Sequence, residues 1–279
     1  MSEVLVNTEW VAEHGNDANV RLVEVDVDTT QYATGHIPGA VGFDWQTQLQ
    51  DNIARDIISQ QDFEALLSRS GISNDTHVVL YGDNNNWFAA YAFWLFKLYG
   101  HEAVSLVDGG RKKWLAEERP LTTDVPDYAA TNYQVSAVHT ELRADRDFIR
   151  ARLHSPQFAL VDVRSVAEYT GEIIAPPGMS ETAQRPGHIP GARNIPWVQA
   201  VAEDGTFKSR EDLAKLYGGK GVSGEAADTV AYCRIGERSS HTWFALKYIL
   251  GYENVRNYDG SWTEWGNLIG APIAKGDQP

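Results

Sequence analysis

Short apolar runs alternate with helical patterns along the whole chain. The apolar runs are four or five residues long and rich in β-branched residues, so each predicts a strand. Strands without a polar face are typical of a parallel sheet that is covered on both sides. The predicted strands are residues 22–25, 77–81, 103–107, 159–163, 229–232 and 254–258.

The segments between these runs predict helices over residues 60–70, 87–98, 209–217 and 239–250. In the last of these, apolar residues recur at helical spacing. The run over residues 87–96 is apolar all round, is too short to span a bilayer and ends at Lys97, so we expect a buried helix there. Alternation of strand and helix predicts an α/β fold, with the ligand at the carboxyl ends of the strands.

The chain contains an internal repeat. The hexapeptide GHIPGA occurs at residues 35–40 and 187–192, and LVEVD at 22–26 matches LVDVR at 160–164. Residues 81–100 also align without a gap onto 232–251. The repeat covers about half the chain, far more than the ~20–50 residues of a solenoid unit, so it indicates a duplicated domain.

The repeat sets the expected domain organisation. We predict a first domain over residues 1–122, an extended linker over 123–140 and a second domain over 141–279. The second copy carries an insertion over residues 171–186, whose prolines and glycines predict an irregular loop.

Composition narrows the function. The formal net charge is −14, which disfavours nucleic-acid and membrane-surface partners and means that an anionic substrate needs a local positive site. A single cysteine excludes an internal disulfide, a cysteine-rich zinc site and an iron–sulfur cluster, and favours the cytoplasm. The first residues have neither a basic region nor an apolar stretch, so we expect no signal peptide.

Cys233 lies directly after a predicted strand. The residues that follow it, through Arg234, Gly236 and Arg238, form a short loop, and Ser239 and Ser240 are expected to cap the next helix. Such a loop aims backbone N–H groups and a helix N-terminus at one point. We therefore expect a thiolate with a lowered pKa that can hold an anionic adduct on sulfur.

The first copy serves as an internal control. It has the same strand and helix, but Gly82 stands in place of Cys233 and Asp83 in place of Arg234. The fold therefore does not need the thiol, and we predict one active and one inactive domain. Four residues separate Cys233 from Arg238, one fewer than in cysteine phosphatases. This tighter loop favours a small adduct, such as one sulfur atom.

The chain resembles the tandem-domain rhodanese family of sulfurtransferases over nearly its whole length. The resemblance rests on both GHIPGA copies, LVDVR, the loop CRIGER at 233–238, and DGGRKKW at 108–114 matched by DGSWTEW at 259–265. It implies two α/β rhodanese-like domains, each a mainly parallel sheet flanked by helices, with an inactive first domain and a catalytic site that faces the interdomain cleft. The pattern Cys-Arg-x-Gly-x-Arg looks like the thiosulfate-using branch, since the 3-mercaptopyruvate branch typically has Gly after Cys.

The resemblance also implies a reaction. The Cys233 thiolate takes the outer sulfur of thiosulfate as a persulfide, and a thiophilic acceptor such as cyanide then removes it, without a metal or an organic cofactor. Two positions depart from the family pattern: Ile235 stands where some members have Lys, and Glu168 where some have an Arg that contacts the donor. We expect Arg185 to supply the replacement cation. The expected substrate-binding residues are Arg234, Ile235, Gly236, Glu237, Arg238, Arg164, Arg185 and Trp87.

Some residues carry two interpretations. Arg164 either binds the donor or forms a strand-end ion pair with Asp162, and Trp87 either covers the persulfide or packs in a core. Glu237 is expected to point outward from the anion site. His36 and His188 recur in both GHIPGA copies, which favours a role in fixing a turn over acid–base chemistry.

Three alternative functions stay open at this point. The first is a 3-mercaptopyruvate sulfurtransferase, the second a phosphatase or arsenate reductase, and the third a non-enzymatic binding or sulfur-trafficking module. The ratio of activities on the two sulfur donors separates the first alternative from a thiosulfate sulfurtransferase.

Overall fold

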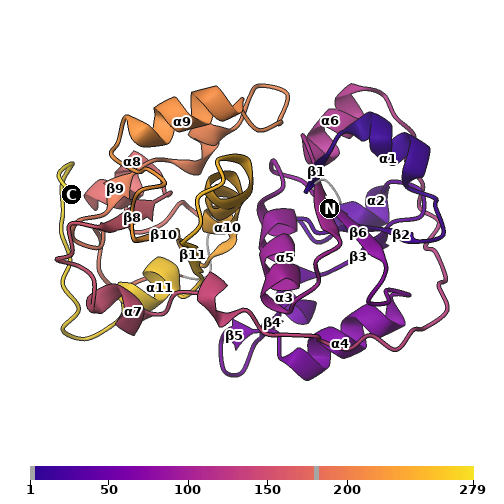
Figure 1. Cartoon of the computed structure of the whole chain (residues 1–279), viewed down its shortest axis with the longest axis horizontal. Coiled ribbons are helices and arrows are strands. Elements are labelled where there is room, and N and C mark those ends of the chain that lie inside the picture. Colours follow the sequence, from indigo (N-terminus) through magenta and orange to yellow (C-terminus); the bar gives the residue numbers. More distant parts are fainter. Residues whose placement is uncertain (1–3, 179–181) are drawn as a thin grey trace. The chain divides into compact units, whose positions relative to one another are not determined.

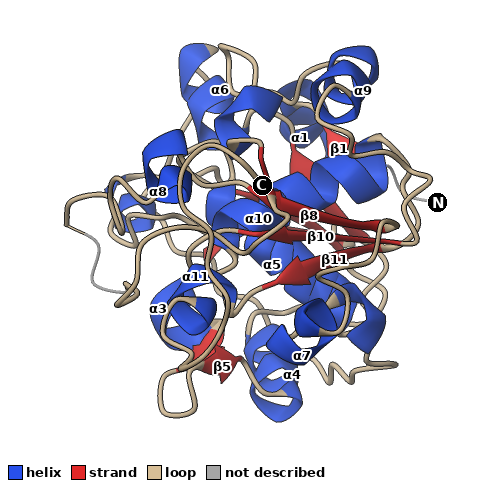
Figure 2. Ribbon diagram, turned by 90° about the vertical axis from the view of Figure 1, so that its left-hand side faces the viewer, coloured by secondary structure: helices blue, strands red, loops and turns tan. Residues whose placement is uncertain are grey.

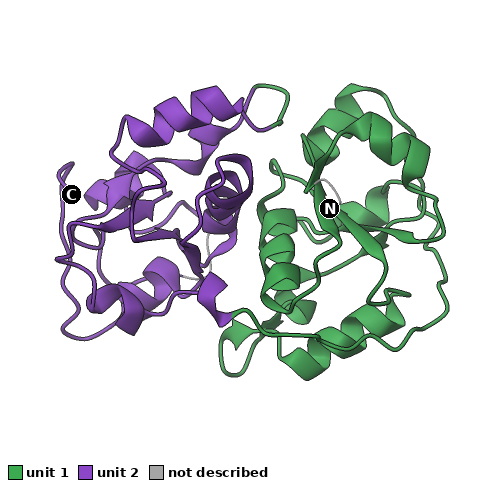
Figure 3. Ribbon diagram, viewed as in Figure 1, with its two compact units in different colours: residues 1–139, 203–206 green, residues 140–202, 207–279 purple. Residues whose placement is uncertain are grey.

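The computed structural model describes residues 4–178 and 182–279. The chain forms two compact units (Figure 3). Unit 1 comprises Met1–His139 with Glu203–Thr206, and unit 2 comprises Thr140–Ala202 with Phe207–Pro279. Residues 123–139, expected in a linker, thus belong to unit 1. Residues 179–181 of the expected insertion loop lie outside the described residues.

Unit 1 is built on a parallel sheet, and Figure 1 labels its strands β1, β2, β3 and β6. The strand order is β1-β7-β6-β2-β3. Its central strands pair in register, with Val20 opposite His77 and Glu24 opposite Tyr81. The strands are β1 (Leu5–Val6), β2 (Val20–Glu24), β3 (Val41–Gly42), β6 (His77–Tyr81) and β7 (Val104–Val107). A separate antiparallel pair is formed by β4 (Gln50–Asp51) and β5 (Asp56–Ile57).

Helices flank the sheet of unit 1. They are α1 (Thr8–His14), α2 (Gln31–Thr34), α3 (Trp45–Gln48), α4 (Gln60–Arg69), α5 (Trp87–Leu98) and α6 (Gly110–Ala116). Helix α5 has the predicted bounds and is buried from Phe88 to Leu98, because it is apolar on every face. Its buried Lys97 keeps its charge paired, with Nζ 2.7 Å from the Glu102 carboxylate.

Unit 2 repeats this plan with the parallel strand order β11-β10-β8-β9. Figure 2 shows β8, β10 and β11 side by side, with helices around them. The strands are β8 (Phe158–Asp162), β9 (Arg193–Asn194), β10 (Asp228–Tyr232) and β11 (Val255–Tyr258). The helices are α7 (Arg146–Arg150), α8 (Val166–Thr170), α9 (Arg210–Gly218), α10 (Glu237–Phe244) and α11 (Ser261–Trp265), with 3₁₀ turns at Thr140–Leu142 and Trp197–Ala200 and a π-helical turn at Ala245–Ile249.

The α/β fold with two mainly parallel, helix-flanked sheets is confirmed, and all six predicted strands are present. The start of the helix after Cys233 was predicted wrongly. Helix α10 begins at Glu237, and its N-cap is Gly236 at φ +104°, so Ser239 and Ser240 lie inside the helix instead of capping it. No helix within the described residues is long and apolar enough to cross a bilayer.

His36 and His188 fix equivalent turns, as predicted. The Nδ1 atom of His188 is 2.8 Å from the Tyr169 carbonyl oxygen, and Nε2 is 3.0 Å from that of Gln278. His36 makes the matching contacts with the carbonyls of Tyr32 and Asp124. Both imidazoles are fully buried and occupied by backbone groups, which leaves them no part in acid–base chemistry.

Candidate active site

Cys233 lies at the carboxyl end of β10, where the sequence placed it. The loop is fastened to the turn between β11 and α11. Cys233 N–H donates to Ser261 Oγ at 3.0 Å, and the backbone N–H groups of Trp262 and Thr263 donate to the carbonyls of Cys233 and Arg234. These bonds fix the backbone of the residue that carries the thiol.

The sulfur is surrounded by groups of its own loop. Gly236 N–H donates to Sγ at 3.1 Å, and Ser239 Oγ lies 3.7 Å from it. The thiol in turn donates to Glu237 Oε2 at 3.3 Å. Gly236 is required at its position, because a Cβ atom there would lie 2.8 Å from the backbone of Asp259.

The expectation of a lowered cysteine pKa is wrong for this geometry. Burial raises the pKa of the Cys233 thiol, and the neighbouring Glu237 carboxylate raises it further. Arg238 and the hydrogen bonds from Ser239 oppose this rise without cancelling it. Glu237 therefore does not point outward as expected: it is buried, with its carboxylate against the sulfur.

Arg238 is held by two carboxylates. Its terminal nitrogens lie 3.1 and 3.2 Å from Glu168, and its Nε is 3.5 Å from Glu237 Oε1. Burial alone would raise the pKa of Glu168, but Arg238 and the Ser165 N–H hold it below its usual value. Glu168 therefore serves as the counter-ion of the loop arginine, at the position where some family members have a cation.

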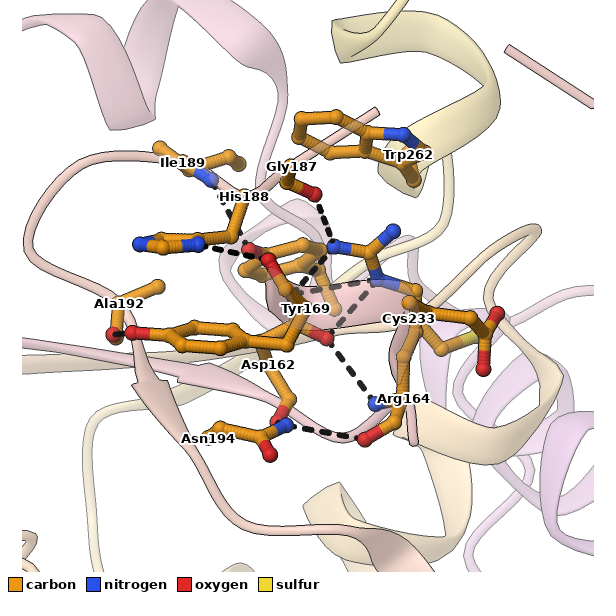
Figure 4. Close-up of polar contacts among 12 residues, drawn as sticks. Asp162, Arg164, Tyr169, Gly187, His188, Ile189, Ala192, Asn194, Cys233 and Trp262 are labelled. Atoms are coloured by element: carbon orange, nitrogen blue, oxygen red, sulfur yellow. Dashed lines mark hydrogen bonds and ion pairs between the residues drawn. The ribbon is translucent and has the colours of Figure 1, made fainter. Parts of the chain in front are cut away.

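The other expected donor-binding residues lie in different surroundings. Arg164 is fully buried and forms the strand-end ion pair: its Nη2 is 2.6 Å from Asp162 Oδ2 and 2.7 Å from the Gly187 carbonyl (Figure 4). Arg185 donates to four backbone carbonyls between Trp265 and Ala271. Arg185 is thus engaged by backbone carbonyls, while Nη1 of Arg164 is buried without a hydrogen-bond partner among the described residues. The donor-binding roles expected for both arginines stay predictions.

The remaining loop residues, Arg234 and Ile235, are both buried beside Cys233. Trp87 is the half-buried first residue of α5 in unit 1, and its expected role at the persulfide stays a prediction. His241 is a buried residue of α10. It stacks on Phe207 at 4.3 Å, and burial lowers its pKa to about 3, so the imidazole stays neutral.

Two polar residues of the site, Asn257 and Ser261, were not singled out from the sequence. Ser239 Oγ donates to Asn257 Oδ1 at 2.6 Å, and Asn257 Nδ2 donates to the Gly236 carbonyl at 3.2 Å. Asn257 thereby braces the loop from β11, and Ser261 braces it from α11. The repeat held a signal for Ser261, since the first copy has Gly110 at that position.

The corresponding loop of unit 1 has different contacts. Asn86 stands at the position of Glu237; its Oδ1 accepts from Gly82 N–H at 3.0 Å and its Nδ2 donates to the Val107 carbonyl. A Cβ atom on Gly82 would lie 2.1 Å from the Val25 carbonyl oxygen, so the unit 1 loop has no room for a cysteine. Within the described residues, no group of three His, Cys, Asp or Glu side chains is arranged to hold a metal ion.

Comparison with known proteins identifies the family. The model of the rhodanese-like domain matches the chain twice, over residues 7–117 and 145–268. The chain belongs to the rhodanese family. A "Sulfur carrier protein TtuD" of Thermus thermophilus is 56% identical over 99% of this chain and 98% of its own length. A "Putative thiosulfate sulfurtransferase" of Haloferax volcanii is 54% identical over 99% and 97%.

Solved rhodanese structures share the fold of both units. The 3-mercaptopyruvate sulfurtransferase SseA of Escherichia coli superposes with a TM-score of 0.81 at 26% identity, covering 94% of this rhodanese and 99% of SseA. YnjE superposes with a TM-score of 0.86 at 26% identity, covering 98% of this chain and 68% of YnjE.

Proposed function

We propose that this rhodanese is a thiosulfate sulfurtransferase that carries the transferred sulfur as a persulfide on Cys233. The observation that carries the proposal is the surroundings of Sγ. Gly236 N–H at the N-terminus of α10 donates to it, and the positive charge of Arg238 acts on it. Such a site stabilises an extra sulfur atom and the negative charge that comes with it.

The reaction has two half-reactions. The Cys233 thiolate attacks the outer sulfur of thiosulfate; a new S–S bond forms, and the old one breaks as sulfite leaves with the bonding electron pair. The acceptor, cyanide in the simplest case, then attacks the outer sulfur of the persulfide, forms thiocyanate and returns the thiolate. In this proposal Ile235 and Gly236 line the loop beside this sulfur, and the charges of Arg234 and Arg238 attract the anionic donor.

We propose that unit 1 is catalytically inactive and that unit 2 carries out the reaction. Residues 1–122 form a catalytically inactive rhodanese-like domain and 141–279 the catalytic domain, and residues 123–140, most of which belong to compact unit 1, connect the two. The loop of unit 1 has Gly82 in place of the nucleophile, which supports its inactivity. A chain whose single cysteine is a reactive thiol fits a reducing compartment, so we place it in the cytoplasm.

A specific observation favours a second donor, 3-mercaptopyruvate: SseA, named for that substrate, shares the fold over nearly its full length. The loop itself favours thiosulfate. Arg234 directly follows the cysteine and adds a positive charge for a dianion, where the 3-mercaptopyruvate branch typically has glycine. A relative that is 56% identical is named a sulfur carrier protein, which favours a carrier role for the persulfide sulfur in addition to its transfer to a small thiophile.

Intact mass after incubation with each donor tests the proposal. We expect wild-type protein to gain one sulfur atom from thiosulfate, faster than from 3-mercaptopyruvate, and to lose it to cyanide, while Cys233→Ser gains none. Faster loading from 3-mercaptopyruvate would overturn the donor assignment and keep the persulfide mechanism. No gain from either donor would overturn the proposed reaction.

A further inference from the structure

We propose that Cys233 and Glu237 share one proton, and that the Glu237 carboxylate takes the thiol proton and holds it while the cysteine carries sulfur. This inference rests on the proposed sulfur transfer. It adds a proton acceptor to a site in which no histidine contacts the sulfur among the described residues.

The hydrogen bonds around Sγ identify the acceptor. Gly236 N–H donates to the sulfur, and the Ser239 hydroxyl already donates to Asn257 at 2.6 Å. Neither group is placed to take a proton from the thiol. Glu237 Oε2, at 3.3 Å from Sγ, is a carboxylate oxygen with that capacity. Its side chain is 2% exposed and that of Cys233 is 0% exposed, so water competes little with this contact.

Electrostatics limits the pair to one negative charge. Two anions at this distance in a buried site repel each other strongly, so a thiolate beside an ionised Glu237 is disfavoured. The raised pKa of the Cys233 thiol agrees with a resting state in which the charge lies on Glu237. When the sulfur becomes anionic, as thiolate or persulfide, Glu237 is neutral.

The charged groups that face the Cys233–Glu237 pair come from helices α10 and α8, from the segment after β11 and from the cysteine loop itself. Arg238 of α10 contacts Glu237 and is neutralised on its other side by Glu168 of α8. Asp259, which follows β11 and packs against Gly236, is bound by Arg143 through two contacts of 2.8 Å.

Arg234 adds a positive charge from the loop itself, and the neighbouring His241 stays neutral. Asp259 and Arg143 neutralise each other through their two contacts. The proton shared by Cys233 and Glu237 is therefore the one that moves during the reaction.

The proton balance closes over the cycle. The thiol gives its proton to Glu237, and the resulting thiolate attacks the donor to form a persulfide anion. The acceptor removes the outer sulfur and restores the thiolate, which takes the proton back from Glu237. The pair carries one negative charge in every state, so Arg238 and Glu168 keep their arrangement throughout.

Unit 1 supports the assignment as an internal comparison. The positions of the thiol and of the carboxylate are Gly82 and Asn86 there, so both members of the pair are absent together. The Asn86 amide bridges two backbone groups. This structural role does not require a carboxylate that accepts a proton.

Ultraviolet titration of the thiolate tests the shared proton, because the chain has a single cysteine and the Cys233→Ser spectrum can be subtracted. We expect Glu237→Gln to move the thiolate midpoint down by about one pH unit or more, since the competing anion is gone. Glu237→Asp should keep a midpoint close to wild type, and the exposed Glu225→Gln is the matched control. Equal midpoints in wild type and Glu237→Gln would overturn the proposal.

Difference infrared spectroscopy separates proton uptake from charge repulsion alone. Loading wild type with thiosulfate should produce the C=O band of a protonated carboxylic acid, which Glu237→Gln lacks and Glu225→Gln keeps. A loaded wild type without that band would also overturn the inference. Failure of loading itself, seen by mass, would overturn the proposed reaction instead, while the donor-free titration would still report on the shared proton.

Discussion

The Arg164 guanidinium and the Asp162 carboxylate form an ion pair in which neither side chain has any exposed surface. The equivalent carboxylate of unit 1, Glu24, is paired with a guanidinium from a different place. Arg111 of α6 supplies it, and Asp26 stands at the position of Arg164. The two units therefore neutralise equivalent buried carboxylates with arginines from different positions. Arg164 comes from early in the second repeat, and Arg111 comes from late in the first.

Loss of the Arg164 charge should destabilise unit 2 strongly. Arg164→Met leaves Asp162 as an uncompensated buried anion, which costs about 3–5 kcal/mol in comparable pairs. The free energy of unfolding in urea measures the loss. Arg146→Met is the control, because its pair with Glu264 is partly exposed and should cost less than about 1 kcal/mol. Equal losses in the two variants would contradict the buried pair.

The stability of unit 1 should fall as the pH rises. Burial, and then the Glu24 and Asp83 charges, raise the pKa of Asp26 to about 9. The folded state thus binds this proton more tightly than the unfolded state, so the stabilisation is complete below the ordinary pKa near 4 and is lost toward pH 9. Asp26→Asn keeps a neutral side chain at every pH.

We therefore expect Asp26→Asn to lose less stability than wild type between about pH 5 and about pH 9, as measured by the urea midpoint of unit 1. The exposed Asp75→Asn serves as the control and should follow wild type. Parallel pH profiles for wild type and Asp26→Asn would show that Asp26 titrates normally in the fold.

Restoring the cysteine in unit 1 should not create a second sulfur-carrying site. The Cβ atom of Gly82→Cys would lie 2.1 Å from the Val25 carbonyl oxygen, so the loop has to shift, at a cost of about 1–3 kcal/mol. Intact mass after thiosulfate should show one added sulfur per chain, as in wild type. Gly218→Ala, which has free space, is the stability control. Two added sulfurs would contradict this expectation.

Neutralising Glu168 should strengthen binding of an anionic donor. Glu168→Gln leaves Arg238 without one of its two carboxylates, and Gln can still serve in the capping box with Ser165 at the start of α8. We expect the KM for thiosulfate to fall by about 3–10-fold, since a charge-assisted contact is worth about 1 kcal/mol or more. A KM that rises with unchanged stability would show that Glu168 aids the donor.

The sequence was sufficient for the fold because its signals are local and repeated. A pattern within a few residues predicts each of three features: the strands that are apolar on both faces, the helix of residues 87–98 and the two GHIPGA turns. Strands β1, β3 and β9 have two residues each, too few to show a period, and their pairing depends on the rest of the sheet.

The candidate site was predictable in position and less so in electrostatics. The first residue of α10 decides whether Glu237 belongs to the loop or to the helix. Helix α10 begins two residues earlier than predicted, and the Glu237 carboxylate contacts the sulfur. The carboxylate partner of Arg164 was one of two interpretations of the sequence, but the backbone carbonyls that bind Arg164 and Arg185 come together only in the folded chain. Counting the arginines near the site in the sequence therefore overestimates how many of them are free to bind a sulfur donor.

The different positions of Arg164 and Arg111 restrict which segments of the two units can be combined in one domain. A crossover between the two repeats that joins β2 of unit 1 to α11 of unit 2 would unite Glu24 and Asp26 with Trp262, leaving buried acids without a guanidinium. The reciprocal crossover would place Arg164 and Arg111 around one carboxylate, Asp162. Either recombinant would fold poorly. In any exchange of segments between the two units, the arginine therefore has to move together with the carboxylate that it neutralises.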